Sequence, residues 1–123
     1  MNQVMLYVAA GVTGLWGVSH LFATRGAVAG FGDISADNRR IITMEWIAEG
    51  VALISIATFV AVAAAIDSGS AVASGVFAVA IGTLVVLAVV SLFTGFRVGF
   101  LPYKLCPVIF GISAALIAWG AWL

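Results

Sequence analysis

The sequence predicts an all-α integral membrane protein, built as one bundle of four transmembrane helices. Three observations support this fold class. Hydrophobic residues make up 64% of the 123 residues and charged residues only 8%, whereas soluble domains are about half apolar and about a quarter charged. The mean hydropathy is +1.25. Four apolar stretches are long enough to cross the ~30 Å hydrocarbon core of a bilayer as helices, which takes about 20 residues each.

Each predicted span is a continuous apolar run. We place the four spans at about residues 4–23, 41–66, 72–96 and 106–122. Runs of this length favour helices over a transmembrane barrel, whose strands are short and alternate between apolar and polar residues. Ser35 is placed to cap the second helix, with Asp37 in its first turn. Residues 1–123 are therefore expected to form a single membrane domain without a separate soluble domain.

The connections predict how neighbouring helices run. The polar sequence 67–70 is short, so the second and third helices should be antiparallel neighbours. The connection 24–40 is longer and semi-apolar, and we expect it to lie along the membrane interface. Pro107 falls within the first turn of the predicted fourth helix, where its missing N–H does no harm.

The basic residues predict the orientation in the membrane. All five lie in the first and third connections, at Arg25, Arg39, Arg40, Arg97 and Lys104. Because cytoplasmic loops are enriched in Lys and Arg, these two connections are expected in the cytoplasm and both termini outside. We expect a multi-pass protein of the inner (plasma) membrane of a bacterial or archaeal cell.

Small residues predict where helices approach one another. Ala10 and Gly14 in the first span, and Ala78 and Gly82 in the third, are four residues apart. Such pairs let helix backbones come close in lipid, where the hydrophobic effect does not drive association. They fit contacts between copies in a homo-oligomer as well as packing inside one bundle, and the sequence leaves both open.

Two acidic residues lie within an apolar span. Glu45 and Glu49 are four residues apart, so they occupy one face of the second helix. A carboxylate at membrane depth costs several kcal/mol unless it is paired, protonated or facing water, which makes it a functional-site hypothesis by default. His20, near the cytoplasmic end of the first span, is expected at the depth of Glu45, within direct or water-bridged reach. We predict that Glu45, Glu49 and His20 are catalytic acid–base groups.

Other polar and aromatic side chains are expected in the same cytoplasmic half. Six of them would line a substrate pocket: Trp16, Trp46, Thr94, Arg97, Tyr103 and Cys106. Structural roles remain as alternatives. The glutamates would then pair with Arg25, Arg97 or Lys104 to fix the packing of the helices, the tryptophans would only pack, and Cys106 would be an inert thiol.

The remaining composition excludes several classes of site. One cysteine excludes an intramolecular disulfide framework, and one histidine excludes a multi-histidine metal site within one chain. We therefore expect no metal and no cofactor. The formal net charge of 0 leaves no basic face for nucleic acid. The expected partners are the lipid bilayer and a lipophilic small molecule, with either a homo-oligomer or a larger membrane complex as the assembly.

Residues Met44–Leu53 read Met-Glu-Trp-Ile-Ala-Glu-Gly-Val-Ala-Leu, which places an acid before a run rich in small and apolar residues. With this motif the sequence resembles the small four-helix DoxX-like membrane proteins. Its length, its four spans and its short loops fit that group over nearly the whole chain. The resemblance implies a subunit or partner of a membrane redox enzyme as one function.

Three functions remain open from the sequence. An enzyme, which we favour, would use the acid–base residues to isomerise, cyclise or open the epoxide of a lipophilic molecule, with Trp16 or Trp46 stabilising positive charge. A non-catalytic subunit would use its small residues for contacts in a larger complex. A proton-coupled transporter would use Glu49 as its carrier, although no ionisable side chain lies in the outer half of a span.

Overall fold

The computed structural model describes all 123 residues and contains helices but no strand. Four α-helices follow one another along the chain: α1 (Gln3–Ala29), α2 (Ala36–Asp67), α3 (Ala71–Phe93) and α4 (Leu101–Trp122), with a short 3-10 helix, η1 (Gly95–Arg97), before α4. Each α-helix is long and apolar enough to cross a membrane. The predicted all-α architecture, with four helices of membrane-spanning length and hydropathy, is therefore confirmed.

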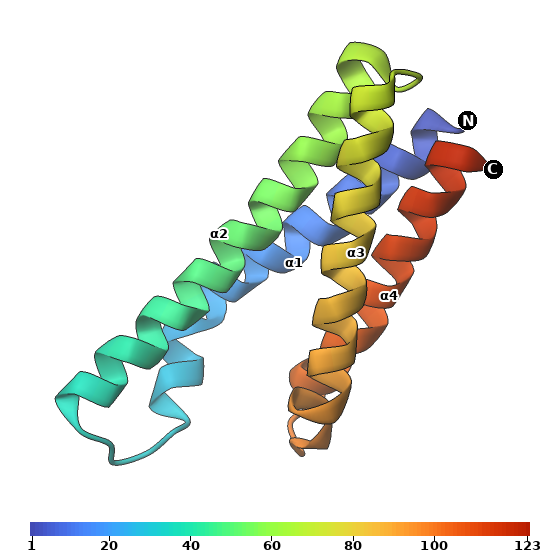
Figure 1. Cartoon of the computed structure of the whole chain (residues 1–123). Coiled ribbons are helices and arrows are strands. Elements are labelled where there is room, and N and C mark those ends of the chain that lie inside the picture. The colour runs from blue at the N-terminus through green and yellow to red at the C-terminus, as the bar shows by residue number, and fades with distance from the viewer.

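The helices form two arms that diverge (Figure 1). α1 and α2 run side by side as one arm, and α3 and α4 form the other. The arms meet at the end that holds both termini and the α2–α3 turn, which we call the terminal end. They separate toward the end that holds the first and third connections, which we call the basic end. α1 also packs on α4, and the contact of α2 with α3 is less extensive.

The terminal end is fixed by close packing of α1 on α4. The backbone N–H of Asn2 donates to the carbonyl oxygen of Gly120 at 2.8 Å, and the Asn2 side chain caps α1 by accepting from the amides of Val4 and Met5. A Cβ atom on Gly120 would lie 2.8 Å from Cγ of Leu6. Only glycine therefore lets α4 approach α1 this closely.

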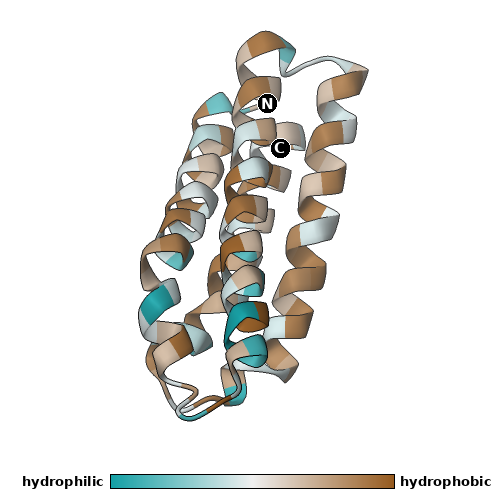
Figure 2. Cartoon of the chain, turned by 90° about the vertical axis from the view of Figure 1, so that its left-hand side faces the viewer, coloured by the Kyte–Doolittle hydropathy of each residue, from teal (hydrophilic) through white to brown (hydrophobic).

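The core lies where the two arms meet. Its largest fully buried apolar side chains come from all four helices: Leu6, Leu53, Phe77, Leu84, Phe110 and Ile117. Large apolar side chains also cover the outward faces, as expected for helices surrounded by lipid (Figure 2). Hydrophilic residues gather mainly toward the basic end (Figure 2).

Two local predictions about helix ends are confirmed and two need correction. The Ser35 hydroxyl accepts from the amide of Asn38 as the N-cap of α2, and Asp37 lies in the first turn. The first connection is shorter than predicted because α1 continues to Ala29. Pro107 lies inside α4 and not in its first turn, because α4 already begins at Leu101 with Pro102 as its early proline.

Candidate functional site

A buried histidine and a partly exposed glutamate meet across the α1–α2 interface. Nε2 of His20 lies 3.4 Å from Oε2 of Glu49, and the two side chains are 8% and 41% exposed. His20 is on the third turn from the end of α1, and Glu49 is in the half of α2 nearer the basic end. The pair therefore lies inside the apolar part of the chain, with His20 covered and Glu49 open on one side.

Two glycines explain why these side chains can reach each other. A Cβ atom on Gly17 would lie 2.8 Å from the carbonyl oxygen of Gly50, and a Cβ on Gly50 would lie 2.9 Å from that of Gly17. The backbones of α1 and α2 thus touch one turn from His20 and one residue from Glu49. Small residues at a crossing allow this approach in lipid, and the approach sets the distance between the acid and the imidazole.

The hydrogen bonds of His20 define how many protons the pair holds. Nδ1 lies 3.2 Å from the carbonyl oxygen of Trp16, which can only accept, so Nδ1 carries a proton. A contact between Nε2 and the Glu49 carboxyl then requires one further proton, on nitrogen or on oxygen. Both forms, an imidazolium with a carboxylate or an imidazole with a carboxylic acid, have zero net charge. A hydrogen bond between the two side chains in either form would therefore leave the pair without a net charge.

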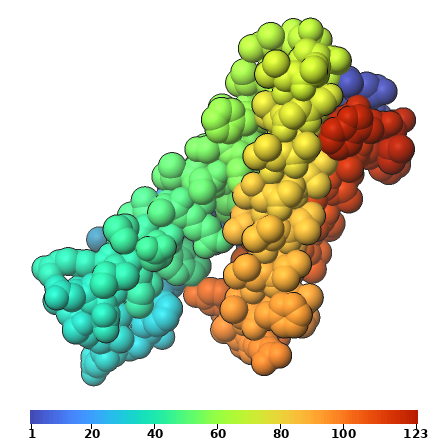
Figure 3. Space-filling view, in the orientation of Figure 1, coloured from blue at the N-terminus to red at the C-terminus, as the bar shows by residue number.

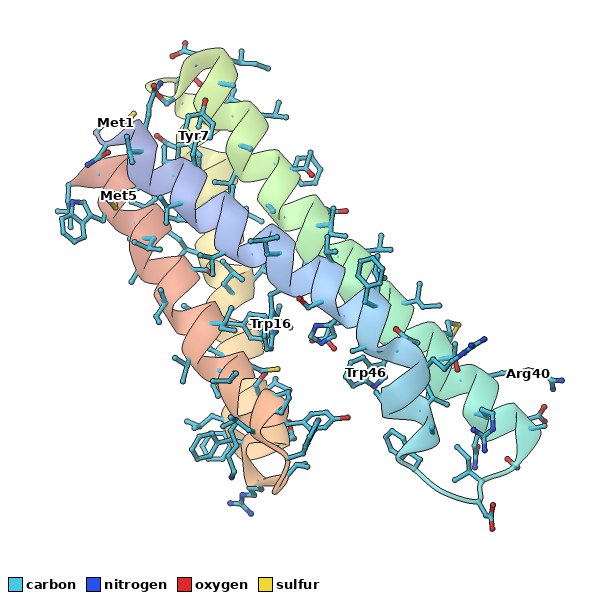
Figure 4. The ribbon with its side chains drawn as sticks, turned by 180° about the vertical axis from the view of Figure 1, so that it is seen from behind. Met1, Met5, Tyr7, Trp16, Arg40 and Trp46 are labelled. Carbon is cyan, nitrogen blue, oxygen red and sulfur yellow. The ribbon has the colours of Figure 1, made fainter.

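Aromatic rings surround the imidazole of His20. The indole of Trp46 stacks on it with a centroid distance of 4.9 Å and an interplanar angle of 30°. The indole of Trp16 meets it edge to face at 5.9 Å. Trp46 in turn meets Tyr103 of α4 edge to face at 5.9 Å. Trp16 and Trp46 point into the gap between the two arms (Figure 4), so this aromatic cluster lies at the junction of the arms.

The structure pairs His20 with Glu49 and not with Glu45. Glu45 is exposed, one turn along α2 toward the basic end, and its side chain makes no hydrogen bond or ion pair. The α1–α2 crossing at Gly17 and Gly50 places His20 level with Glu49. Counting turns from the membrane edge could not locate this crossing, which is why Glu45 was expected nearer to His20.

Cys106 lies at the edge of the cluster. Its thiol lies near the indole of Trp16, and its Sγ is 3.9 Å from the carbonyl oxygen of Pro102. The indole N–H of Trp16 is buried and has no hydrogen-bond partner. Three of the predicted pocket residues are thus found together: Trp16 on α1, and Tyr103 and Cys106 on α4.

Thr94 and Arg97, the other predicted pocket residues, make no hydrogen bond or ion pair with His20 or Glu49. The Thr94 hydroxyl donates to the carbonyl oxygen of Val90 at 2.7 Å. Nζ of Lys104 donates to the carbonyl oxygen of Phe96 at 2.7 Å and lies 4.8 Å from the centre of its ring. Arg97 is exposed and makes no ion pair. The alternative in which a glutamate pairs with Arg25, Arg97 or Lys104 is not seen, since the ion pairs of the chain are His20–Glu49 and Arg40–Asp37.

The sequence did not reveal a buried hydroxyl group that lacks a hydrogen-bond partner. Ser113 on α4 is 0% exposed, and its hydroxyl has no hydrogen-bond partner. No pattern in the sequence distinguishes it from the serines that bond back to their own helix, such as Ser91.

Comparison with protein-family models, with curated proteins and with solved structures finds no match to the chain. Its function is therefore inferred from the geometry of the His20–Glu49 pair and the groups around it.

Proposed function

We propose that the protein is a membrane enzyme that performs acid–base chemistry on a lipophilic small molecule. The observation that carries this proposal is the His20–Glu49 contact of 3.4 Å within the apolar part of the bundle, without a Lys or Arg partner. Ionisable residues within apolar spans are usually paired, and a purely structural acid here would be expected to pair with one of the basic residues at the same end. Glu49 instead contacts His20 and stays partly exposed.

In the proposed reaction the Glu49 carboxyl exchanges a proton with the substrate, and His20 supplies or receives that proton through Nε2. The Trp16 carbonyl fixes the orientation of the ring by accepting from Nδ1, as the second partner of a catalytic histidine does. Isomerisation of a double bond would add a proton at one carbon and remove one from another. Opening or cyclising an epoxide would begin with protonation of its oxygen. Neither reaction needs a cofactor.

The divergence of the arms supports access from the bilayer. The space-filling view shows a wedge between α2 and α3 that widens toward the basic end (Figure 3). A lipophilic molecule moving within the membrane would enter this wedge sideways and meet the aromatic cluster.

By the distribution of basic residues, the basic end is the cytoplasmic one and both termini lie outside, in the inner membrane of a bacterial or archaeal cell.

The test does not require a known substrate. Proteoliposomes would be incubated with a total lipid extract in D2O and, separately, in ¹⁸O-labelled water, and the extract would be searched by mass spectrometry for species with shifted mass. We expect a protein-dependent product that gains deuterium (isomerisation) or ¹⁸O (hydrolytic epoxide opening). Glu49→Gln should abolish it, because an amide neither donates nor removes the proton at this position.

Asp33→Asn is the matched control, because it also removes one carboxylate but lies in the exposed connection between α1 and α2. Labelling that is equal in wild type and Glu49→Gln would refute the proposal.

The resemblance of Met44–Leu53 to DoxX-like proteins remains a prediction, and it favours the alternative of a non-catalytic subunit. Isolation of the protein in a stoichiometric complex, without any labelled product, would support that alternative.

A further inference from the structure

We propose that this site binds a lipophilic organic cation, such as an alkylammonium amphiphile, and releases the proton of the His20–Glu49 pair as it does so. The inference deepens the proposed function, because it uses the same pair and names the charge of the ligand. It identifies the molecule as one that carries a positive charge, or develops one during the reaction.

The charges around Glu49 favour a cation. His20 from α1 meets Glu49 directly, Glu45 lies one turn away on the same helix, and α4 brings Tyr103 against Trp46 and Cys106 near Trp16. α3 carries no ionisable side chain. Lys104 is held by Phe96. Once the pair gives up its proton, the fixed charge at the site is that of carboxylates alone.

The aromatic rings favour the same ligand. The faces of Trp and Tyr rings attract ammonium groups, and the attraction is stronger where water is excluded. Trp46 and Tyr103 bring two such rings together from opposite arms, with their centroids 5.9 Å apart. Trp16 adds a third ring beside His20. Cages of aromatic rings recognise quaternary ammonium groups in proteins, and here the rings surround the imidazole that contacts the partly exposed Glu49.

Neutrality couples the cation to the proton. The pair with its proton has no net charge, so a cation that bound beside it would leave an uncompensated positive charge in the apolar part of the bundle, which is costly. Release of one proton leaves an imidazole and a carboxylate, and the bound cation then restores a net charge of zero. The hydrocarbon part of the ligand would occupy the wedge between α2 and α3 (Figure 3).

The experiment compares two amphiphiles of equal chain length and opposite charge, decyltrimethylammonium and decanesulfonate, with the whole protein in lipid nanodiscs. Isothermal titration in buffers of different ionisation enthalpy gives both the affinity and the number of protons released. We expect saturable binding of the ammonium with release of about one proton, and binding that tightens about tenfold per pH unit while the pair holds its proton. The sulfonate should show only the partitioning seen with empty nanodiscs.

Two variants separate the charge from the rings. Glu49→Gln should abolish proton release and the pH dependence. Trp46→Leu should weaken ammonium binding by about 2- to 30-fold while proton release persists. Asp33→Asn should behave like wild type, and helix content should be checked by circular dichroism for each variant.

Equal binding of the two amphiphiles, or ammonium binding without proton release in wild type, would overturn the inference. The proposed enzyme would survive that result if isotope labelling still depended on Glu49, and its ligand would then be neutral. Cation-for-proton exchange without isotope labelling would instead support a binding role for the same site.

Discussion

The indole of Trp46 and the phenol ring of Tyr103 meet edge to face with their centroids 5.9 Å apart. This contact joins α2 of one arm to α4 of the other, although no Cα atom of α2 lies within 8 Å of a Cα atom of α4. Two long side chains therefore connect the arms where their backbones have already separated. The aromatic contact sets the width of the junction in which His20 and Glu49 lie.

Tyr103→Ala is expected to let the arms separate further at the basic end. Spin labels at Arg40→Cys and Val98→Cys, both at exposed positions in a Cys106→Ala background, would report the inter-arm distance by electron–electron dipolar spectroscopy. The distance should lengthen and its distribution broaden, with a loss of about 0.5–1.5 kcal/mol from the aromatic pair. Phe22→Ala, which truncates a ring that is 86% exposed, should leave the distribution unchanged. An identical distribution in Tyr103→Ala would show that the ring contact does not hold the arms.

Gly17→Ala and Gly50→Ala are expected to destabilise the bundle and separate His20 from Glu49. Each added methyl group would lie within 3 Å of backbone atoms of the facing helix, so α1 and α2 must move apart, at a cost of about 1–3 kcal/mol. Thermal unfolding in detergent measures this loss. Gly11→Ala is the matched control on α1, because no atom lies within 4 Å of its added methyl group; it should be neutral or slightly stabilising. Equal stability of all three variants would argue against the close crossing.

Removal of one partner of the His20–Glu49 pair is expected to cost more than removal of both. His20→Phe leaves Glu49 without a partner, and Glu49→Leu leaves His20 without one, and a lone charge in an apolar setting is costly. The double variant His20→Phe/Glu49→Leu should recover at least about 1 kcal/mol relative to the sum of the single changes. Unfolding free energies for the four proteins complete the cycle. Simple additivity would mean that the two side chains do not interact.

Ser113→Ala is expected to leave stability unchanged or to raise it by up to about 1 kcal/mol. The hydroxyl is buried without a hydrogen-bond partner, so its removal relieves an unsatisfied group and leaves only a small void. Ala114→Ser tests the converse on the next residue of α4, which is also buried; it should destabilise by about 1–3 kcal/mol. A clear loss of stability in Ser113→Ala would indicate that the hydroxyl does have a partner.

The orientation in the membrane can be tested by labelling single cysteines in the Cys106→Ala background. Asp33→Cys lies between α1 and α2, and Ser70→Cys lies between α2 and α3. In intact cells a membrane-impermeant maleimide should modify Ser70→Cys and spare Asp33→Cys, because the basic connections are expected inside. Permeabilised cells should show labelling at both positions. The reverse pattern in intact cells would invert the orientation.

The residues that the sequence identified fall into two groups. The helices and the cap at Ser35 follow from local features, namely apolar runs and a hydroxyl before a helix, and the structure agrees with them. The partner of His20 could not be obtained in this way. It depends on where two helices cross, and that point is set by Gly17 and Gly50, which are only two of the 14 glycines in the chain.

By itself, the sequence determined that this chain forms four membrane-spanning helices and that two glutamates and one histidine lie among apolar residues. Apolar length and the scarcity of charge are local properties, so they can be read along the chain. Only the tertiary structure decided that Glu49, and not Glu45, meets His20, and that Trp46 and Tyr103 connect diverging arms. Those contacts depend on crossing points and angles between helices, which arise from the packing of all four helices together.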